Sequence, residues 1–218
     1  MIELIVKGSL SYLLGSIVGS LLIGQFRGID IRTMGSGNAG TTNMLRTQGK
    51  AAALAVFVID LGKGWIATGL LAPLTFPAQI VPETGALHAW AATVCGLAVI
   101  VGHVYPVCYG FRGGKGFATF VGVVLGLSPL LVLVMLVGWL IAVILSGYVG
   151  LASMVSAAAV AVAIAATSPA PRVPLLTFGL VAAVLIVFTH RTNIARMLAG
   201  NESRAMRLWL LGARRRHG

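Results

Sequence analysis

The chain has 218 residues, of which 58% are hydrophobic and 10% charged, and its mean hydropathy is +0.96. Soluble domains are roughly 45–50% apolar and about 25% charged, so the composition excludes an ordinary soluble domain. It predicts an all-α integral membrane protein, a single bundle of about seven transmembrane helices; a helix that crosses the membrane needs roughly 20 mostly apolar residues.

The charge balance is strongly basic, because 16 Lys and Arg face 5 Asp and Glu and give a net charge of +11. In a membrane protein this balance indicates loops that face anionic lipid, and it also suits a polyanionic substrate. Two cysteines are too few for a disulfide framework. With four histidines and no paired-cysteine motif, the sequence predicts no metal site and implies no cofactor.

Apolar runs predict the transmembrane helices, which in chain order are 5–23, 51–71, 86–101, 117–127, 130–146, 149–166 and 175–188. Ser128-Pro129 separates the fourth run from the fifth, and one long kinked helix is the alternative. Gly15 and Gly19 lie four residues apart in the first run and would allow another helix to approach closely.

Two charged residues, Asp60 and Lys63, lie inside the second predicted span and share one helical face. Charges within a span cost at least about 2.5 kcal/mol each, so they usually face a cavity or each other. Two interpretations stay open: an ion pair that orients the helix, and a lining for a functional site.

The basic residues of the loops lie almost entirely in the segments 24–50, 102–119 and 189–218, whereas the opposite loops contain only Arg172. Because positive loops stay in the cytoplasm, we expect the N-terminus outside and the C-terminus in the cytoplasm. The three polar segments 24–50, 102–119 and 189–203 would then share the cytoplasmic face, followed by a basic tail, 204–218.

The first polar segment holds a glycine-rich stretch from Gly35 to Arg46. Its glycines permit tight turns, its hydroxyl and amide side chains offer hydrogen bonds, and Arg46 suits a phosphate. We therefore predict a phosphate cradle; a surface loop whose glycines serve only turns is the alternative. The spacing of Gly35, Gly37 and Gly40 also matches a dinucleotide fingerprint, but an apolar span precedes it, which excludes a Rossmann site.

The second polar segment ends in Gly113-Gly114-Lys115-Gly116, directly before an apolar run. A helix that starts there would direct its N-terminal N–H groups and dipole toward the position of Lys115. The stretch is not a Walker loop, because Tyr109 replaces the first glycine and Gly116 replaces the Ser or Thr.

The third polar segment contains His190, Asn193, Arg196 and Glu202. His103 and His190 are the candidates for general acid–base chemistry. Asn193 would share a face with His190 if the last helix continues through them. We expect Glu202 to pair with Arg196.

These three segments resemble one family, the bacterial membrane acyl-phosphate:glycerol-3-phosphate acyltransferases. The first motif is Gly35-Ser36-Gly37-Asn38-Ala39-Gly40-Thr41-Thr42-Asn43 with Arg46. The second is Gly102-His103 with Pro106, then Phe111-x-Gly113-Gly114-Lys115-Gly116-x-Ala118-Thr119. The third is His190-Arg191-x-Asn193-Ile194-x-Arg196, ending near Gly200 and Glu202.

The resemblance implies one transmembrane acyltransferase domain over residues 1–218, in the cytoplasmic membrane of a bacterium with its active site facing the cytoplasm. It implies transfer of a fatty acyl group from acyl phosphate to glycerol 3-phosphate, which gives 1-acylglycerol 3-phosphate and inorganic phosphate and begins phospholipid synthesis. The implied partners are both substrates, membrane lipids and the enzyme that makes acyl phosphate, but no nucleic acid.

The site hypothesis groups Ser36, His190 and Asn193 as catalytic, with the Ser36 hydroxyl expected to bind phosphate rather than to act as a nucleophile. Substrate and phosphate binding is assigned to Gly37, Asn38, Gly40, Thr41, Asn43, Arg46, His103, Gly113, Gly114, Lys115, Gly116 and Arg196. The His-x₄-Asp motif of soluble acyltransferases is absent: Thr93, Cys108 and Ala195 stand five residues after His88, His103 and His190.

Two other classes of function fit part of the sequence pattern. A carrier for a phosphorylated metabolite would also have a basic cytoplasmic mouth, but the sequence shows no inverted repeat and no line of charges across several spans. A membrane-anchored nucleic-acid binder could use Arg214, Arg215 and Arg216, although a basic end facing anionic lipid is the simpler interpretation.

Overall fold

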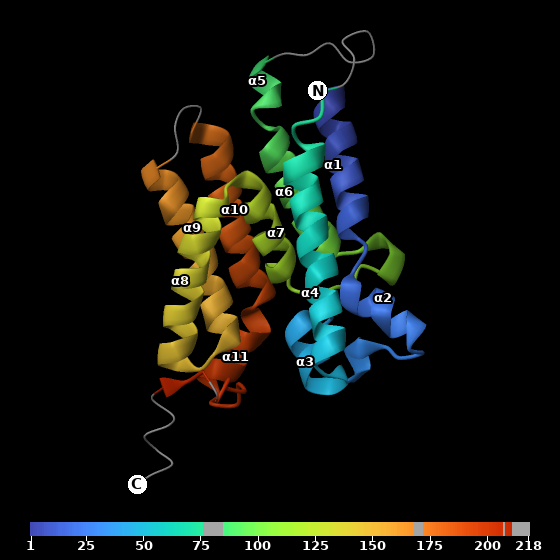
Figure 1. Cartoon of the computed structure of the whole chain (residues 1–218), viewed down its shortest axis with the longest axis vertical. Coiled ribbons are helices and arrows are strands. Elements are labelled where there is room, and N and C mark those ends of the chain that lie inside the picture. Colours follow the sequence, from blue (N-terminus) through green and yellow to red (C-terminus); the bar gives the residue numbers. More distant parts are fainter. Residues whose placement is uncertain (76–84, 168–171, 207, 211–218) are drawn as a thin grey trace. The chain divides into compact units, whose positions relative to one another are not determined.

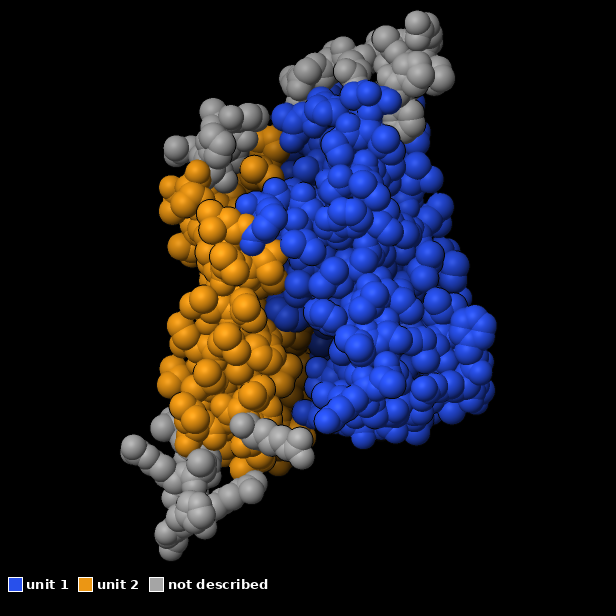
Figure 2. Space-filling model, in the orientation of Figure 1, with its two compact units in different colours: residues 1–129 blue, residues 130–218 orange. Residues whose placement is uncertain are grey.

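The computed structural model describes residues 1–75, 85–167, 172–206 and 208–210, and in these ranges its regular structure is helical, without strands (Figure 1). The chain divides into two compact units, residues 1–129 and 130–218, which Figure 2 shows in blue and orange. The all-helical architecture agrees with the fold class expected from the composition.

Unit 1 contains α1 (Ile2–Gly15), α2 (Gly19–Phe26), α3 (Thr41–Gln48), α4 (Lys50–Trp65), α5 (Gly85–His88), α6 (Ala91–Val104) and α7 (Phe117–Leu127). The helix continues after α4 as a π-helix, Ile66–Leu71. Two short 3₁₀ turns lie at Ile31–Thr33 and Val107–Tyr109. Within this unit α1 packs along α6 and α4 packs along α7 (Figure 1).

Unit 2 is formed by α8 (Pro129–Ser146), which begins at the boundary, and by α9 (Val149–Thr167), α10 (Arg172–Thr189) and α11 (Arg191–Leu198). The long helices α9 and α10 pack against each other, and the short α11 contacts both. Ser146, Gly147 and Tyr148 form the tight turn between α8 and α9, with Gly147 at a φ of +77°.

Four helices of the described chain are long and apolar enough to cross a membrane: Lys50–Leu71, Ala91–Tyr109, Pro129–Ser146 and Val149–Thr167. Two bent pairs, α1 with α2 and α10 with α11, raise the number to six if each is one span. At 11 residues, α7 is about 17 Å long against about 30 Å of hydrocarbon, so it is too short to cross alone. The number of seven spans and the orientation of the termini stay predictions.

The predicted break at Ser128-Pro129 is confirmed, because α7 ends at Leu127 and α8 begins at Pro129. Ser128 is extended, with φ −165° and ψ 122°, as the residue before a proline prefers. The third span differs from the expected 86–101: the long helix begins at Ala91, and the short α5 precedes it.

The prediction of one continuous first helix over 5–23 was wrong, because the chain breaks between Gly15 and Gly19 and bends by 44°. Such a break exposes backbone groups that lipid cannot satisfy. Lys63 of α4 donates to the carbonyls of Gly15 and Ile17 at 2.9 and 2.7 Å, and the N–H of Gly19 donates to Asp60 Oδ1 at 3.1 Å.

Asp60 and Lys63 form a buried ion pair with an N–O distance of 3.0 Å, so the ion-pair interpretation is confirmed. The pair does more than orient α4: its cationic end caps the C-terminus of α1 and its anionic end caps the N-terminus of α2. Each charge therefore lies at the helix end whose dipole it complements.

Glycines permit the closest helix contacts of unit 1. A Cβ built on Gly15 would lie 2.2 Å from the carbonyl oxygen of Val99 on α6, which confirms the close approach expected at Gly15. A Cβ on Gly122 of α7 would lie 1.9 Å from the carbonyl oxygen of Leu61 on α4. The backbones of these helix pairs are in direct contact, and no larger residue fits without separating them.

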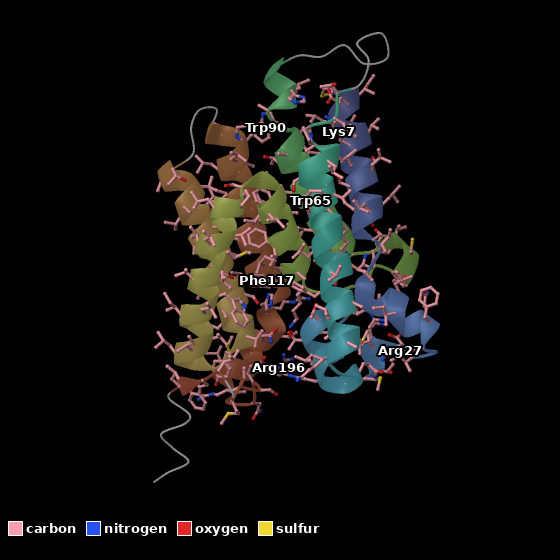
Figure 3. The ribbon with its side chains drawn as sticks, viewed as in Figure 1. Lys7, Arg27, Trp65, Trp90, Phe117 and Arg196 are labelled. Carbon is pink, nitrogen blue, oxygen red and sulfur yellow. The ribbon has the colours of Figure 1, made fainter. Side chains whose placement is uncertain are left out.

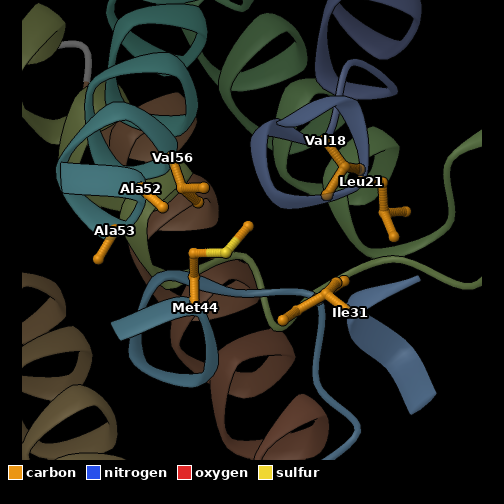
Figure 4. Close-up of a cluster of buried hydrophobic side chains, with 8 residues drawn as sticks. Val18, Leu21, Ile31, Met44, Ala52, Ala53 and Val56 are labelled. Carbon is orange, nitrogen blue, oxygen red and sulfur yellow. The ribbon is translucent and has the colours of Figure 1, made fainter. Parts of the chain in front are cut away.

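A small apolar core fixes the polar segment 24–50 to α2 and α4 (Figure 4). Ile31 and Met44 come from this segment, are fully buried, and pack among the apolar residues Val18, Leu21, Ala52, Ala53 and Val56. Ala39 belongs to the same cluster. Apolar packing therefore holds the glycine-rich stretch against α2 and α4.

We expect Gly122→Ala to destabilise the protein, because the new Cβ forces α7 away from the Leu61 carbonyl. Overpacking costs about 1–3 kcal/mol, which corresponds to a decrease in melting temperature of roughly 3–10 °C for a chain of this size. Thermal unfolding in detergent measures the change. Gly62→Ala is the matched control, because a Cβ there meets nothing within 4 Å; equal decreases in the two variants would contradict the packing argument.

Candidate active site

Asn43 organises the first glycine-rich stretch. Its Oδ1 accepts the N–H of Ser36 at 2.9 Å, and its Nδ2 donates to the carbonyls of Met34 and Ile31 at 2.9 and 3.2 Å. Gly35 has a φ of +55°, and a Cβ there would lie 2.3 Å from Asn43 Oδ1. Asn43 was predicted to bind phosphate; in the structure its side chain is hydrogen-bonded to the backbone of its own loop.

The stretch leads into the N-terminus of α3. The N-cap is Gly40, whose lack of a side chain leaves the first N–H groups of the helix without a side-chain cap. Thr41 Oγ1 is buried and has no hydrogen-bond partner among the described residues. A helix N-terminus with an available hydroxyl is a site of the kind that binds phosphate.

The second glycine-rich stretch leads into α7, which begins after Gly116 as expected. Gly116 is the N-cap, has a φ of +83°, and offers no side-chain cap. The N–H groups of Gly113 and Gly114 donate to the carbonyls of Val104 and His103 at 3.0 and 3.2 Å. This stretch is therefore fastened to the C-terminal end of α6.

The two glycine-rich stretches touch each other. A Cβ built on Gly114 would lie 2.5 Å from the carbonyl oxygen of Ala39, so only glycine permits the contact. Ala39 directly precedes the N-cap of α3, and Gly114 is two residues before the N-cap of α7. The uncapped starts of two helices therefore lie close to one contact point.

Arg32 links the polar segments 24–50 and 102–119 through hydrogen bonds. Its Nη1 donates to the carbonyls of Tyr109 and Arg112 at 3.1 and 3.2 Å, and its Nη2 pairs with Asp30 Oδ2 at 2.8 Å. The hydrogen bonds from Arg32 hold the pKa of the Asp30 carboxyl below its usual range, and that carboxylate raises the pKa of Arg32. Sequence reasoning counted Arg32 only as a loop charge.

The predicted binding side chains of unit 1 differ in exposure. Ser36, Gly37 and Arg46 are exposed, and Asn38, Thr41 and Lys115 are half-buried. His103 is buried, with its Nδ1 2.8 Å from Lys63 Nζ. Hydroxyl, amide and cationic groups therefore lie on the glycine-rich stretches and on α3, around backbone donors that favour an anion.

His190 lies between α10 and α11 in unit 2, where the axis bends by 53°. The last helix does not run straight through His190 to Asn193, which was the condition for these two residues to share a helical face. His190 is buried, and its Nδ1 lies 2.8 Å from the carbonyl oxygen of Ile186. Because a carbonyl only accepts, Nδ1 carries a proton.

Glu202 joins two of the predicted site residues. Its Oε2 pairs with Arg196 Nε at 2.6 Å, which confirms the expected pair. Its Oε1 accepts from Asn193 Nδ2 at 2.6 Å, a contact that the sequence did not predict. The carboxylate thereby fixes which end of the Asn193 amide faces it. No group of three or more His, Cys, Asp and Glu side chains is arranged as metal ligands in the described ranges.

Comparisons with known proteins place this chain in a family of membrane enzymes. Residues 5–200 match the family model described as glycerol-3-phosphate acyltransferase. The glycerol-3-phosphate acyltransferase of Aquifex aeolicus is 40% identical over 195 residues, which cover 89% of this chain and 95% of that protein. The glycerol-3-phosphate acyltransferase of Geobacter sulfurreducens is 38% identical, and the match covers 94% of this chain and 98% of that protein.

Solved structures agree with the sequence comparisons. The crystal structure of PlsY (YgiH), an integral membrane glycerol 3-phosphate acyltransferase in its glycerol 3-phosphate form, matches with a TM-score of 0.79 and 36% identity. The match covers 92% of this chain and 94% of PlsY. The lysophosphatidic acid form of the same protein matches with a TM-score of 0.77. This chain belongs to the glycerol-3-phosphate acyltransferase family and is an integral membrane protein.

We expect Asn43→Asp to lower activity at least tenfold, because a carboxylate cannot donate to the carbonyls of Met34 and Ile31 and leaves them unsatisfied. Acyl transfer by the purified variant measures the loss. Gln48→Glu on the same helix introduces the same amide-to-acid change and serves as the control. If both variants lose activity equally, added charge rather than the Asn43 bonds is responsible.

The Asp30–Arg32 pair predicts a dependence of stability on acid pH. Because the pKa of Asp30 is lowered in the folded protein, its contribution is complete above the ordinary carboxyl pKa of about 4 and is lost as pH falls through the folded value. The pair is partly exposed, so the melting temperature of Asp30→Asn should lie only a few degrees below wild type, about 2–4 °C at most. This difference should vanish at low pH; a difference that is constant from pH 7 to 3 would exclude the linkage.

Proposed function

We propose that this protein transfers a fatty acyl group from acyl phosphate to glycerol 3-phosphate, giving 1-acylglycerol 3-phosphate and inorganic phosphate. The proposal includes a location in the cytoplasmic membrane of a bacterium, with the polar segments on the cytoplasmic side. Residues 1–218 would act as one enzyme, and the basic tail 204–218 would contact anionic lipid.

One observation carries the proposal: the contact of Gly114 with the Ala39 carbonyl, near the starts of α3 and α7. Both substrates contain a phosphate, and both helix starts offer backbone N–H groups without a side-chain cap. Arg46 and Lys115 add positive charge on the same two segments. Family membership and the glycerol 3-phosphate and lysophosphatidic acid forms of PlsY support the same substrate class.

The proposed reaction needs little covalent help from the protein. The glycerol hydroxyl oxygen attacks the acyl carbonyl carbon, the bond from that carbon to the phosphate oxygen breaks, and inorganic phosphate leaves. Because acyl phosphate is already activated, positioning of the two substrates supplies much of the rate. Donors at the leaving phosphate and at the acyl oxygen stabilise the charge that develops there.

The hydroxyl proton needs an acceptor. A phosphate oxygen of a substrate is one, since no carboxylate lies in the glycine-rich stretches. His190 is the other: with one proton held on Nδ1 by the Ile186 carbonyl, a neutral ring would accept the second proton at Nε2. A histidine base would give a pH profile governed by an imidazole, and His190→Ala would abolish that profile; a substrate acceptor would leave it intact.

Each polar segment has a proposed role in binding the substrates. The first stretch, with Ser36, Gly37, Asn38, Gly40, Thr41 and Arg46, binds the phosphate of acyl phosphate. The second stretch, with Gly113, Gly114, Lys115 and Gly116, binds glycerol 3-phosphate. Asn193 and Arg196, whose side chains Glu202 holds, are proposed to orient substrate together with His190.

We expect the purified protein in detergent to form 1-acylglycerol 3-phosphate from palmitoyl phosphate and radiolabelled glycerol 3-phosphate, with release of inorganic phosphate. Palmitoyl-CoA should give no product under the same conditions. Arg46→Ala should lower the rate at least tenfold, since it removes a charge-assisted hydrogen bond to phosphate. This decrease would show that the product comes from the enzyme and not from uncatalysed transfer. Product from palmitoyl-CoA alone would refute the acyl-phosphate donor, and uptake into vesicles without product in detergent would indicate a carrier.

A further inference from the structure

The Asp60–Lys63 pair lies against a third polar residue, His103 of α6. Lys63 Nζ is within 3.0 Å of four acceptors: the carbonyls of Gly15 and Ile17, Asp60 Oδ1, and His103 Nδ1. His103 Nδ1 also lies 3.4 Å from Asp60 Oδ1. All three side chains are buried, so their contacts are not exchanged with bulk water.

The geometry determines which ring nitrogen of His103 carries the proton. The Lys63 ammonium can only donate, and its three N–H groups are shared among the two carbonyls, the Asp60 carboxylate and His103 Nδ1. A proton on His103 Nδ1 would point at this ammonium across 2.8 Å and would be repelled. Nδ1 therefore accepts from Lys63, and the neutral ring carries its proton on Nε2.

The protonated nitrogen lies at the contact between the two glycine-rich stretches. A Cβ built on Gly114 would be 2.3 Å from His103 Nε2 and 2.5 Å from the carbonyl oxygen of Ala39. The main chain of His103 is fixed at the same place, because its carbonyl accepts the N–H of Gly114 at 3.2 Å. The ring thus reaches from the buried ion pair to the point where the two stretches meet.

We propose that Asp60 and Lys63 are positioning residues that hold His103 as its Nε2–H tautomer, with this N–H at the contact of the glycine-rich stretches, where it donates to the phosphate of glycerol 3-phosphate. The inference rests on the proposed function and extends it to two residues inside the membrane span. Asp60 contributes in two ways: it neutralises Lys63, and it fixes the start of α2, which leads into the first stretch.

Two substitutions at His103 distinguish the contributions of its two ring nitrogens. In His103→Gln the amide nitrogen stands near the position of Nε2, and in His103→Asn the amide stands near the position of Nδ1. We expect His103→Asn to raise the KM for glycerol 3-phosphate roughly tenfold or more, as loss of a hydrogen bond to a charged group does. His103→Gln should keep the KM within about twofold of wild type, because it retains the donor.

The role of Lys63 is tested by ¹⁵N NMR of the imidazole in the full-length protein. Wild type should show an unprotonated Nδ1. In Lys63→Met the Asp60 carboxylate becomes the neighbour of Nδ1, so the proton should move to Nδ1 and the KM for glycerol 3-phosphate should rise. Asp60→Asn with Lys63→Met removes the unpaired buried charge and is the second variant if the single one does not fold.

Lys7→Met is the matched control for destabilisation. Lys7 is also a fully buried lysine of unit 1; it pairs with Glu3 and donates to the carbonyl of Ala72 at 2.8 Å. It lies toward the end of this unit opposite Arg27 (Figure 3). At an equal decrease in melting temperature, Lys7→Met should leave the KM unchanged whereas Lys63→Met raises it.

The inference is overturned if Nδ1 is protonated in wild type, if His103→Asn and His103→Gln have the same KM, or if Lys7→Met and Lys63→Met raise the KM equally. Failure of the proposed function looks different. In that case wild type forms no product from acyl phosphate and glycerol 3-phosphate, while the NMR measurement still reports the tautomer of His103.

Discussion

The buried ion pair of Asp60 and Lys63 is the interaction on which the rest of unit 1 depends. A broken helix inside a membrane leaves carbonyl and N–H groups that lipid cannot satisfy. Lys63 satisfies the carbonyls at the end of α1, and Asp60 satisfies the N–H at the start of α2. The break, in turn, redirects the chain into α2 and the segment that carries the first glycine-rich stretch.

The same principle applies at the ends of the other helices that carry candidate site residues. α3 and α7 begin at glycines and have no side-chain caps, which is the arrangement that the proposed phosphate binding requires. In unit 2 the helix bends at His190, and Glu202 fixes the side chains of Asn193 and Arg196. Polar groups that hold the fold thus lie close in sequence to the polar groups of the candidate site.

Much of this was predictable from the sequence. Long apolar runs have one stable form in lipid, so the helices over 51–71 and 149–166 were predicted nearly to the residue. The break at Ser128-Pro129 followed from the restriction that proline places on its neighbour. The three motifs identified the family, because their residue types and order leave few alternatives. The same motifs predicted the candidate site residues, and these assignments stay predictions.

By itself the sequence determined the membrane environment, the helical class, the family and the polar segments, because these depend on composition, periodicity and local motifs. Only the tertiary structure decided that the first span is broken, that Asn43 turns inward, and that Glu202 holds Asn193. It also decided that Lys63 touches His103, 40 residues further along the chain. These features depend on contacts between distant segments, and a pattern of neighbouring residues contains no information about which distant group satisfies a buried donor or acceptor.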